Sequence, residues 1–255
     1  MTLRGEVRRA ARIAGFGALT ATMLPAFVAR SRLAEEASRG RLRERWVGAW
    51  SAGLLGLFGV TVLEEGAPPA SPDRGRLVVA NHRSTADILV LLRRFGGHMV
   101  SRADLAGWPL LGRAARTVGT VFVDRADAVS GANAVRNIRS LLARGATVIV
   151  FPEGTTFTGD EVRPFHAGAF VAALRSGADV VPVGLAYATG SGAAFVNESF
   201  GAHLARMAAA EPSAMAISIG PPIAVGDDAR AAALRDRAHA EVQRLVLASR
   251  ARVDR

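Results

Sequence analysis

The chain has 255 residues, half of them apolar, which is enough for one large α/β domain with an appendage. It contains no cysteine, which excludes disulfides, thiol chemistry and a thiolate metal site. Its formal net charge of +10 comes from arginine alone, since no lysine occurs, and such a basic excess suits an anionic lipid surface or a nucleic acid.

Residues 1–64 are expected to form membrane-associated helices. Residues 13–29 and 46–63 are uncharged runs of 17 and 18 residues, near the ~20 that a membrane-spanning helix needs. Residues 1–45 hold ten arginines and four glutamates, and clustered arginine beside apolar segments favours a membrane surface over nucleic acid. The sequence therefore predicts a helical hairpin that dips into one leaflet with both ends cytoplasmic, with a single transmembrane span as the alternative.

The rest of the chain alternates between two kinds of pattern. Residues 65–75 have the Gly/Pro-rich composition of a linker, and residues 76–255 form the predicted main domain. Short β-rich runs are predicted at 76–81, 98–101, 118–123, 147–151, 180–187 and 215–220. Helical patterns lie between and after them, at 85–95, 130–144, 166–176, 198–210 and 229–251. Strands that alternate with helices predict an α/β fold, a sheet with helices on its faces.

A histidine and an aspartate lie five positions apart just after the run at 76–81, in the segment Asn81-His82-Arg83-Ser84-Thr85-Ala86-Asp87. A histidine takes up a proton near neutral pH, and a carboxylate on its other ring nitrogen fixes its tautomer. Residues five apart are about 140° out of phase on a helix, so the side chains meet only if His82 precedes the helix. Ser84 to Asp87 also match a capping box, and on this segment alone helix capping and catalysis are equal alternatives for Asp87.

Three further blocks follow, at residues 118–125, 151–155 and 180–184: Val-Gly-Thr-Val-Phe-Val-Asp-Arg, Phe-Pro-Glu-Gly-Thr and Val-Val-Pro-Val-Gly. Together with the first block, and in this order, they resemble the lysophosphatidic-acid acyltransferase superfamily over residues 75–190. The resemblance implies a mixed, largely parallel sheet flanked by helices. It implies an O-acyltransferase that moves a fatty acyl chain from a thioester to a lysophospholipid hydroxyl, converting 1-acylglycerol-3-phosphate to phosphatidic acid.

The same resemblance implies the site residues. His82 would be the general base that takes the proton of the attacking hydroxyl, with Asp87 as its orienting partner. The implied substrate-binding residues are Asn81, Arg125, Glu153, Gly154, Thr155 and Arg163. Arg125 would bind the acceptor phosphate, because it follows a strand at the edge where sites of open α/β sheets gather. Glu153 would contact an acceptor hydroxyl or orient an arginine, and a structural turn is its alternative role.

The donor would be acyl-CoA or an acyl carrier protein, and the sequence indicates neither a metal nor a bound cofactor, since no His/Asp/Glu cluster has metal-ligand spacing. His203 and His239 fall in Ala/Arg-rich helical patterns and are expected to be ordinary. The partners would be membrane lipids and the acyl donor, with no nucleic acid. The expected location is the cytoplasmic face of a bacterial inner membrane.

Two residues depart from the common family pattern. Thr156 stands where arginine is frequent and His166 where lysine is usual, while residues 107–110 and the Thr155-Thr156 pair resemble the lyso-ornithine lipid acyltransferase branch. The acceptor head group therefore stays open between glycerol phosphate and ornithine, with Arg163 as the substitute cation. A non-catalytic lipid-binding module and a hydrolase of acyl thioesters are the alternatives from other classes.

Overall fold

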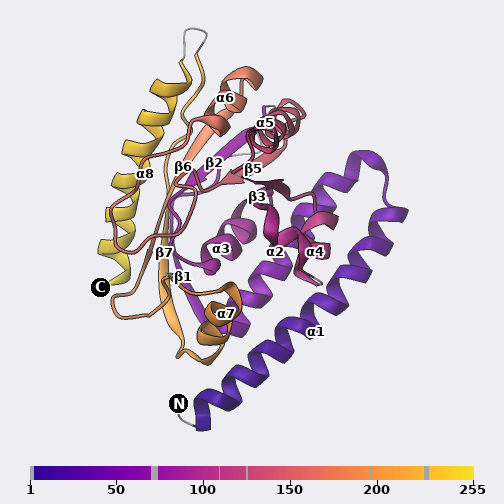
Figure 1. Ribbon diagram of the computed structural model, residues 1–255, viewed down its shortest axis with the longest axis vertical. Helices are drawn as coiled ribbons and strands as arrows, with labels where there is room; N and C mark the ends of the chain where they lie inside the picture. The colour runs from indigo at the N-terminus through magenta and orange to yellow at the C-terminus, as the bar shows by residue number, and fades with distance from the viewer. Residues whose placement is uncertain (1–2, 70–73, 109, 125, 196, 227–229) are drawn as a thin grey trace.

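The computed structural model describes residues 3–69, 74–108, 110–124, 126–195, 197–226 and 230–255. Its centre is a seven-stranded sheet in the order β1-β7-β6-β2-β5-β3-β4 (Figure 1). Only β6 and β7 pair antiparallel among the described neighbours, so the predicted mixed, largely parallel sheet is confirmed. The strands are β1 (Val60–Glu65), β2 (Arg76–Ala80), β3 (His98–Arg102), β4 (Val121–Val123), β5 (Thr147–Val150), β6 (Asp179–Tyr187) and β7 (Ser213–Ile219).

Helices cover both faces of this sheet, which explains why the central strands are continuous apolar runs. One face packs against α2 (Glu36–Phe58), α3 (Thr85–Phe95) and α7 (Phe200–Ala209). The other face packs against α5 (Ala128–Ala143), α6 (Gly168–Ser176) and α8 (Ala231–Val253). The remaining elements are α1 (Leu3–Leu33), which lies outside α2, the short 3-10 helix η1 (Ala103–Gly107) and α4 (Leu111–Thr117) (Figure 1).

The predicted strands and helices of residues 76–255 are confirmed, with ends that differ by at most three residues. The helix at 85–95 has the predicted bounds, because Ser84 caps its start and Gly96, in a left-handed conformation, caps its end. Helix α4 and η1 were not predicted. Both are too short to show a clear apolar period.

Residues 60–64, which were expected to belong to the N-terminal membrane-associated helices, are not helical. Residues Val60–Glu65 are not part of a membrane helix but form β1, which pairs in parallel with β7. Val47, Leu55 and Phe58 of α2 are buried in the core beside α3 and the sheet. The uncharged run at 46–63 is therefore a core helix followed by an edge strand, and Val47, Leu54, Leu55 and Phe58 are buried inside the protein.

The hairpin itself is present, since α1 and α2 pack against each other across a short turn. Among the described helices, α1 alone is long and apolar enough to cross a membrane, and only 17% of its most apolar stretch is buried. Trp46 and Trp50 lie inside the hairpin, where they pack against Phe27 and Phe16 of α1. The apolar side chains of α2 therefore hold the hairpin to the domain, and α1 is left as the more exposed of the two helices.

A buried arginine ties α1 to the two helices beneath it. The Arg12 guanidinium donates to the carbonyl oxygen of Leu57 at 3.0 Å, at the end of α2. It also donates to those of Ala208 and Ala210 at 3.3 and 2.6 Å, at the end of α7. Burial lowers the pKa of Arg12 from its ordinary value. A cation placed here satisfies the orphan carbonyls of two helix C-termini at once.

We expect Arg12→Met to lower the free energy of unfolding by about 1–3 kcal/mol, because several partly buried carbonyls lose their donor. Arg9 lies on the same helix, but its side chain is 38% exposed and pairs with Glu6 at 2.7 Å. Arg9→Met is the matched control and should change stability by less than about 0.5 kcal/mol. Thermal unfolding in detergent micelles measures both, and equal melting temperatures would show that Arg12 is no tether.

Candidate active site

His82 lies in the turn between β2 and α3, and Asp87 in the first turn of α3, as their spacing required. Nδ1 of His82 is 2.9 Å from Oδ2 of Asp87. Because a carboxylate only accepts, Nδ1 carries the proton and Nε2 is the basic nitrogen. The imidazole also stacks on Phe151, with ring centroids 3.9 Å apart and planes 9° from parallel. The ring is thus fixed by one hydrogen bond and one stacking contact.

Asp87 orients the histidine and caps the helix with the same oxygen. Oδ2 accepts from the backbone N–H groups of Arg83 and Ser84 at 2.6 and 2.7 Å, besides the imidazole. Oδ1 accepts from the hydroxyl of Tyr187, at the end of β6. Burial, and then the nearby carboxylate, raise the pKa of Tyr187 well above its ordinary value, so the phenol stays protonated. The two alternatives for Asp87 are therefore combined in one side chain.

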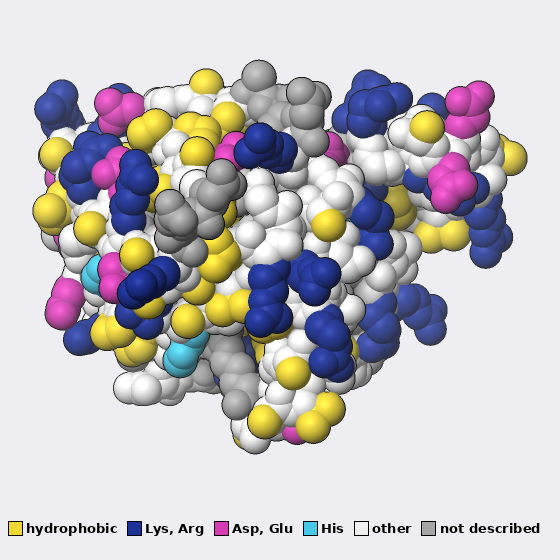
Figure 2. Space-filling view, turned by 90° about the horizontal axis from the view of Figure 1, so that it is seen from above, with side chains coloured by type: hydrophobic (Ala, Val, Ile, Leu, Met, Phe, Trp, Pro, Cys, Tyr) yellow, Lys and Arg dark blue, Asp and Glu magenta, His cyan; other side chains and the backbone are white. Residues whose placement is uncertain are grey.

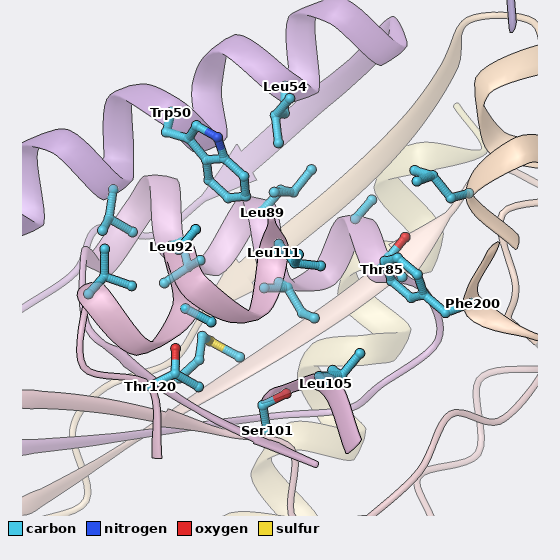
Figure 3. Close-up of a pocket in the computed structure, with 18 of the residues that line it drawn as sticks. Trp50, Leu54, Thr85, Leu89, Leu92, Ser101, Leu105, Leu111, Thr120 and Phe200 are labelled. Atoms are coloured by element: carbon cyan, nitrogen blue, oxygen red, sulfur yellow. The ribbon is translucent and has the colours of Figure 1, made fainter. Parts of the chain in front are cut away.

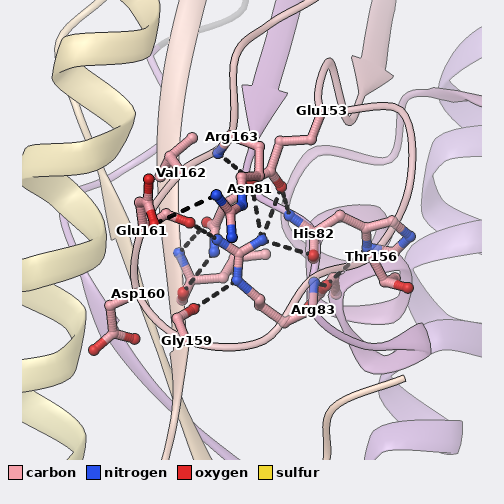
Figure 4. A network of polar contacts seen from close by, with 12 residues as sticks. Asn81, His82, Arg83, Glu153, Thr156, Gly159, Asp160, Glu161, Val162 and Arg163 are labelled. Atoms are coloured by element: carbon pink, nitrogen blue, oxygen red, sulfur yellow. Dashed lines mark hydrogen bonds and ion pairs between the residues drawn. The ribbon is translucent and has the colours of Figure 1, made fainter. Parts of the chain in front are cut away.

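A buried ion pair lies behind the His82 turn (Figure 4). The side chains of Arg83 and Glu153 are 5% and 0% exposed, and Nη1 lies 2.9 Å from Oε2. The same oxygen accepts from the backbone N–H of His82 at 2.7 Å, and Oε1 accepts from that of Arg163 at 2.8 Å. Both oxygens of Glu153 are thus engaged inside the protein. Of its expected roles, the structure contains the orientation of an arginine, and contact with an acceptor hydroxyl stays a prediction.

The partner of Glu153 is itself held by backbone. Arg83 Nε donates to the carbonyl of Gly159 and Nη2 to that of Glu161, both at 2.7 Å. Sequence reasoning missed Arg83 and Tyr187. The residues around Arg83 do not indicate that its side chain is buried. An arginine is rarely buried without a charged partner, and the partner of Arg83, Glu153, lies 70 positions away in the sequence. The signal for Tyr187 was its place at the end of a predicted strand.

Two of the expected substrate-binding residues do not face the site. Nδ2 of Asn81 donates to the carbonyl oxygen of Leu185 at 2.9 Å, and its Oδ1 accepts from the Leu185 N–H at 2.8 Å, so this buried side chain joins β2 to β6. The side chain of Arg163 is 46% exposed, and its guanidinium lies 5.4 Å from the ring centroid of Phe157. Arg125 lies outside the described residues.

Two more of the expected substrate-binding residues, Gly154 and Thr155, border a cavity of about 300 Å³ that His82 also lines. Gly154, with φ 89°, and Thr155 form part of its wall. The rest of the wall is mostly apolar and comes largely from α1, α2, α3, α4 and α7. Figure 3 shows part of it, including Trp50, Leu54, Leu89, Leu111 and Phe200. An apolar cavity with one base in its wall suits an aliphatic chain whose reactive end lies at His82.

Arg102, at the end of β3, is the one permanently charged residue among the described residues that line this cavity. It pairs with Asp104 through two contacts of 3.1 Å, and its side chain is 67% exposed. In the part of the chain that the structure describes, no group of three or more His, Asp or Glu side chains is placed to hold a metal.

Glu153→Gln should lower the free energy of unfolding by about 3–5 kcal/mol, because it leaves the buried charge of Arg83 without a counter-charge. Arg163→Gln is the control, since that side chain is half exposed and should contribute little. Thermal unfolding compares the two variants. If Glu153→Gln were as stable as the control, the structural role of Glu153 would be contradicted.

Comparison with known proteins places this architecture. A family model described as Acyltransferase matches residues 62–186. A lyso-ornithine lipid O-acyltransferase of Pseudomonas aeruginosa is 33% identical over 222 residues, which cover 84% of this chain and 83% of that protein. A 1-acyl-sn-glycerol-3-phosphate acyltransferase of Neisseria gonorrhoeae is 34% identical over 145 residues, 57% of this chain and 56% of that protein.

The crystal structure of PlsC, the 1-acyl-sn-glycerophosphate acyltransferase of Thermotoga maritima, has the same fold, with a TM-score of 0.74 and 21% identity over 96% of this chain and 97% of that one. The expectation of a non-catalytic lipid-binding module is thereby set aside. The chain belongs to the acyltransferase family and is a membrane-associated lysolipid O-acyltransferase of lipid biosynthesis.

Proposed function

We propose that the acceptor is lyso-ornithine lipid. The observation that carries this proposal is the similarity to the Pseudomonas aeruginosa enzyme, which extends over 84% of the chain, whereas that to the Neisseria gonorrhoeae enzyme covers 57%. Thr156 and His166 support it, because they stand where the phosphate-accepting pattern usually has cations. Thr156 also bonds to the Phe195 carbonyl at 2.7 Å, so its hydroxyl is engaged within the protein.

Acylation of 1-acylglycerol-3-phosphate to phosphatidic acid is the second candidate. It is favoured by Arg102, whose guanidinium lines the cavity and is suited to a phosphate. Arg125 follows the neighbouring strand β4 and keeps its expected role as a second phosphate ligand in this proposal.

The geometry of His82 supports direct transfer. Nε2 takes the proton of the acceptor hydroxyl while the hydroxyl oxygen attacks the thioester carbonyl carbon. Asp87 stabilises the imidazolium through Nδ1, 2.9 Å away. The carbon–sulfur bond then breaks, and the leaving thiolate takes the proton from His82. The products are the acylated lipid and a free thiol, from acyl-CoA or acyl carrier protein as donor.

The cavity supports an acyl substrate with its reactive end at the base. Helices α1 and α2 supply one wall, so the chain that binds there lies between the membrane-facing hairpin and the sheet. Each methylene buried in such a wall contributes about 0.8 kcal/mol to binding. The hairpin is therefore part of the substrate site as well as the means of attachment.

We place the enzyme on the cytoplasmic face of a bacterial inner membrane. Helix α1 exposes apolar side chains such as Leu3, Val7 and Leu33. Arginines gather near the α1–α2 turn, which projects at the right of Figure 2, and include Arg30, Arg32, Arg39, Arg41 and Arg45. Each arginine near an anionic leaflet contributes about 1 kcal/mol of attraction, which favours the anionic cytoplasmic side.

His82→Ala should lower kcat for acyl transfer by about 10²–10⁴-fold, the usual contribution of a general base. Asp87→Asn should also be severe, because an amide favours the wrong histidine tautomer. Tyr187→Phe removes one hydrogen bond to Asp87 and should have a smaller effect. Radiolabelled acyl transfer by purified protein in lipid vesicles measures all three. A His82→Ala protein with more than a tenth of wild-type activity would exclude His82 as the base.

The acceptor is tested with a panel of lysolipids. Lyso-ornithine lipid should give the highest kcat/KM, followed by lysophosphatidic acid. Arg102→Gln and Arg125→Gln should each raise the KM for lysophosphatidic acid by about 10 to 100-fold, since a hydrogen bond between charged groups contributes about 1.5–3 kcal/mol. Their effect on an ornithine head group should be smaller. A wild-type preference for lysophosphatidic acid would favour phosphatidic acid synthesis instead.

A further inference from the structure

A second histidine with a carboxylate partner lies beside the cavity. His203, on α7, is buried, and its Nδ1 is 2.9 Å from Oε1 of Glu198. Its Nε2 is 3.0 Å from Oγ1 of Thr85, the first residue of α3. Thr85 follows His82 by three positions in the chain and lines the same cavity (Figure 3). His203, expected to be an ordinary helical histidine, is thus buried, with both ring nitrogens in contact with polar side chains.

The contacts determine where the protons are. Glu198 accepts from Arg206 Nη2 at 2.5 Å, and this hydrogen bond lowers the pKa of Glu198 to about 2, so it is ionised. A lone pair on Nδ1 would repel the carboxylate oxygen, so Nδ1 carries the proton. Arg206 Nη2 also lies 3.0 Å from Nδ1, and the shared carboxylate accepts from both donors. Nε2 is then unprotonated and accepts from the Thr85 hydroxyl.

Two further features suit this hydroxyl to attack a carbonyl. Burial lowers the pKa of His203, which keeps the ring in its basic, neutral form near neutral pH. Thr85 is also partly exposed and lines the cavity, so its hydroxyl can be reached by an acyl chain bound there. Phe195 packs on the His203 ring, with centroids 4.6 Å apart, and also lines the cavity.

We propose that Thr85, His203 and Glu198 form a nucleophile–base–carboxylate triad that hydrolyses acyl thioesters in the same cavity, separately from the transfer by His82. The inference rests on the proposed function for its substrate, an acyl thioester bound in that cavity. The triad would release the acyl chain as a fatty acid when no lysolipid occupies the acceptor position.

The reaction balances in two steps. Thr85 Oγ1 attacks the carbonyl carbon and passes its proton to His203 Nε2; the carbon–sulfur bond breaks, and the thiolate leaves with that proton as a free thiol. Water then attacks the ester carbonyl on Thr85 and passes a proton to Nε2. The ester bond breaks, Thr85 regains its proton and a fatty acid is released.

The test uses the full chain with His82→Ala, so that transfer is removed and the triad is left. The chain has no cysteine, so a thiol-reactive dye reports only thiol released from added acyl-CoA. Without a lysolipid, we expect steady release of thiol and equimolar fatty acid. Adding Thr85→Val should lower the rate by about 10²-fold, while adding Thr85→Ser should keep it. Glu198→Gln should lower it as well.

Intact-mass analysis after rapid acid quench should show one acyl group on the His82→Ala protein, removed by hydroxylamine and absent with Thr85→Val. Thermal unfolding of the Val and Ser variants shows that both are folded. The triad is overturned if His82→Ala releases no thiol, or if Thr85→Val releases it as fast as Thr85→Ser. Failure of the transfer proposal is seen in a different measurement, as acylation of added lysolipid by the His82→Ala protein. The two failures are therefore distinguishable.

Discussion

Oδ2 of Asp87 accepts three hydrogen bonds, from the imidazole of His82 and from the backbone N–H groups of Arg83 and Ser84. The first orients the candidate base, and the other two close the turn that begins α3. Because one oxygen does both, the position of His82 cannot change without uncapping the helix. The carboxylate is fully buried, and this is tolerable only because every bond it accepts is made, including that from Tyr187.

The ion pair of Arg83 and Glu153 forms the layer beneath this turn. It joins the turn after β2 to the loop after β5, and backbone groups at Gly159, Glu161 and Arg163 complete its hydrogen bonds (Figure 4). Removing either partner would leave an uncompensated charge in the interior. Glu153 is therefore part of the structural support of the His82 turn, with both carboxylate oxygens engaged within the protein.

The N-terminal helices have two functions that cannot be separated. Helix α1 leaves most of its apolar stretch exposed, while residues on its inner side and on α2 line the cavity that contains His82. Arg12 ties α1 to the ends of α2 and α7, and β1 extends the sheet beyond β7. A chain shortened to residue 66 would lose an edge strand and a cavity wall, so the hairpin is not a detachable anchor.

The sequence by itself determined the alternation of strands and helices, the bounds of α3 and the meeting of His82 with Asp87, because each depends on residues within a few positions of one another. Only the tertiary structure decided the roles of Arg83 and Asn81, the strand at 60–65 and the Thr85–His203 contact. Their partners lie 70 to 153 positions away. Local periodicity reports which face of an element is apolar, but it contains no information on which distant polar group will be buried against it.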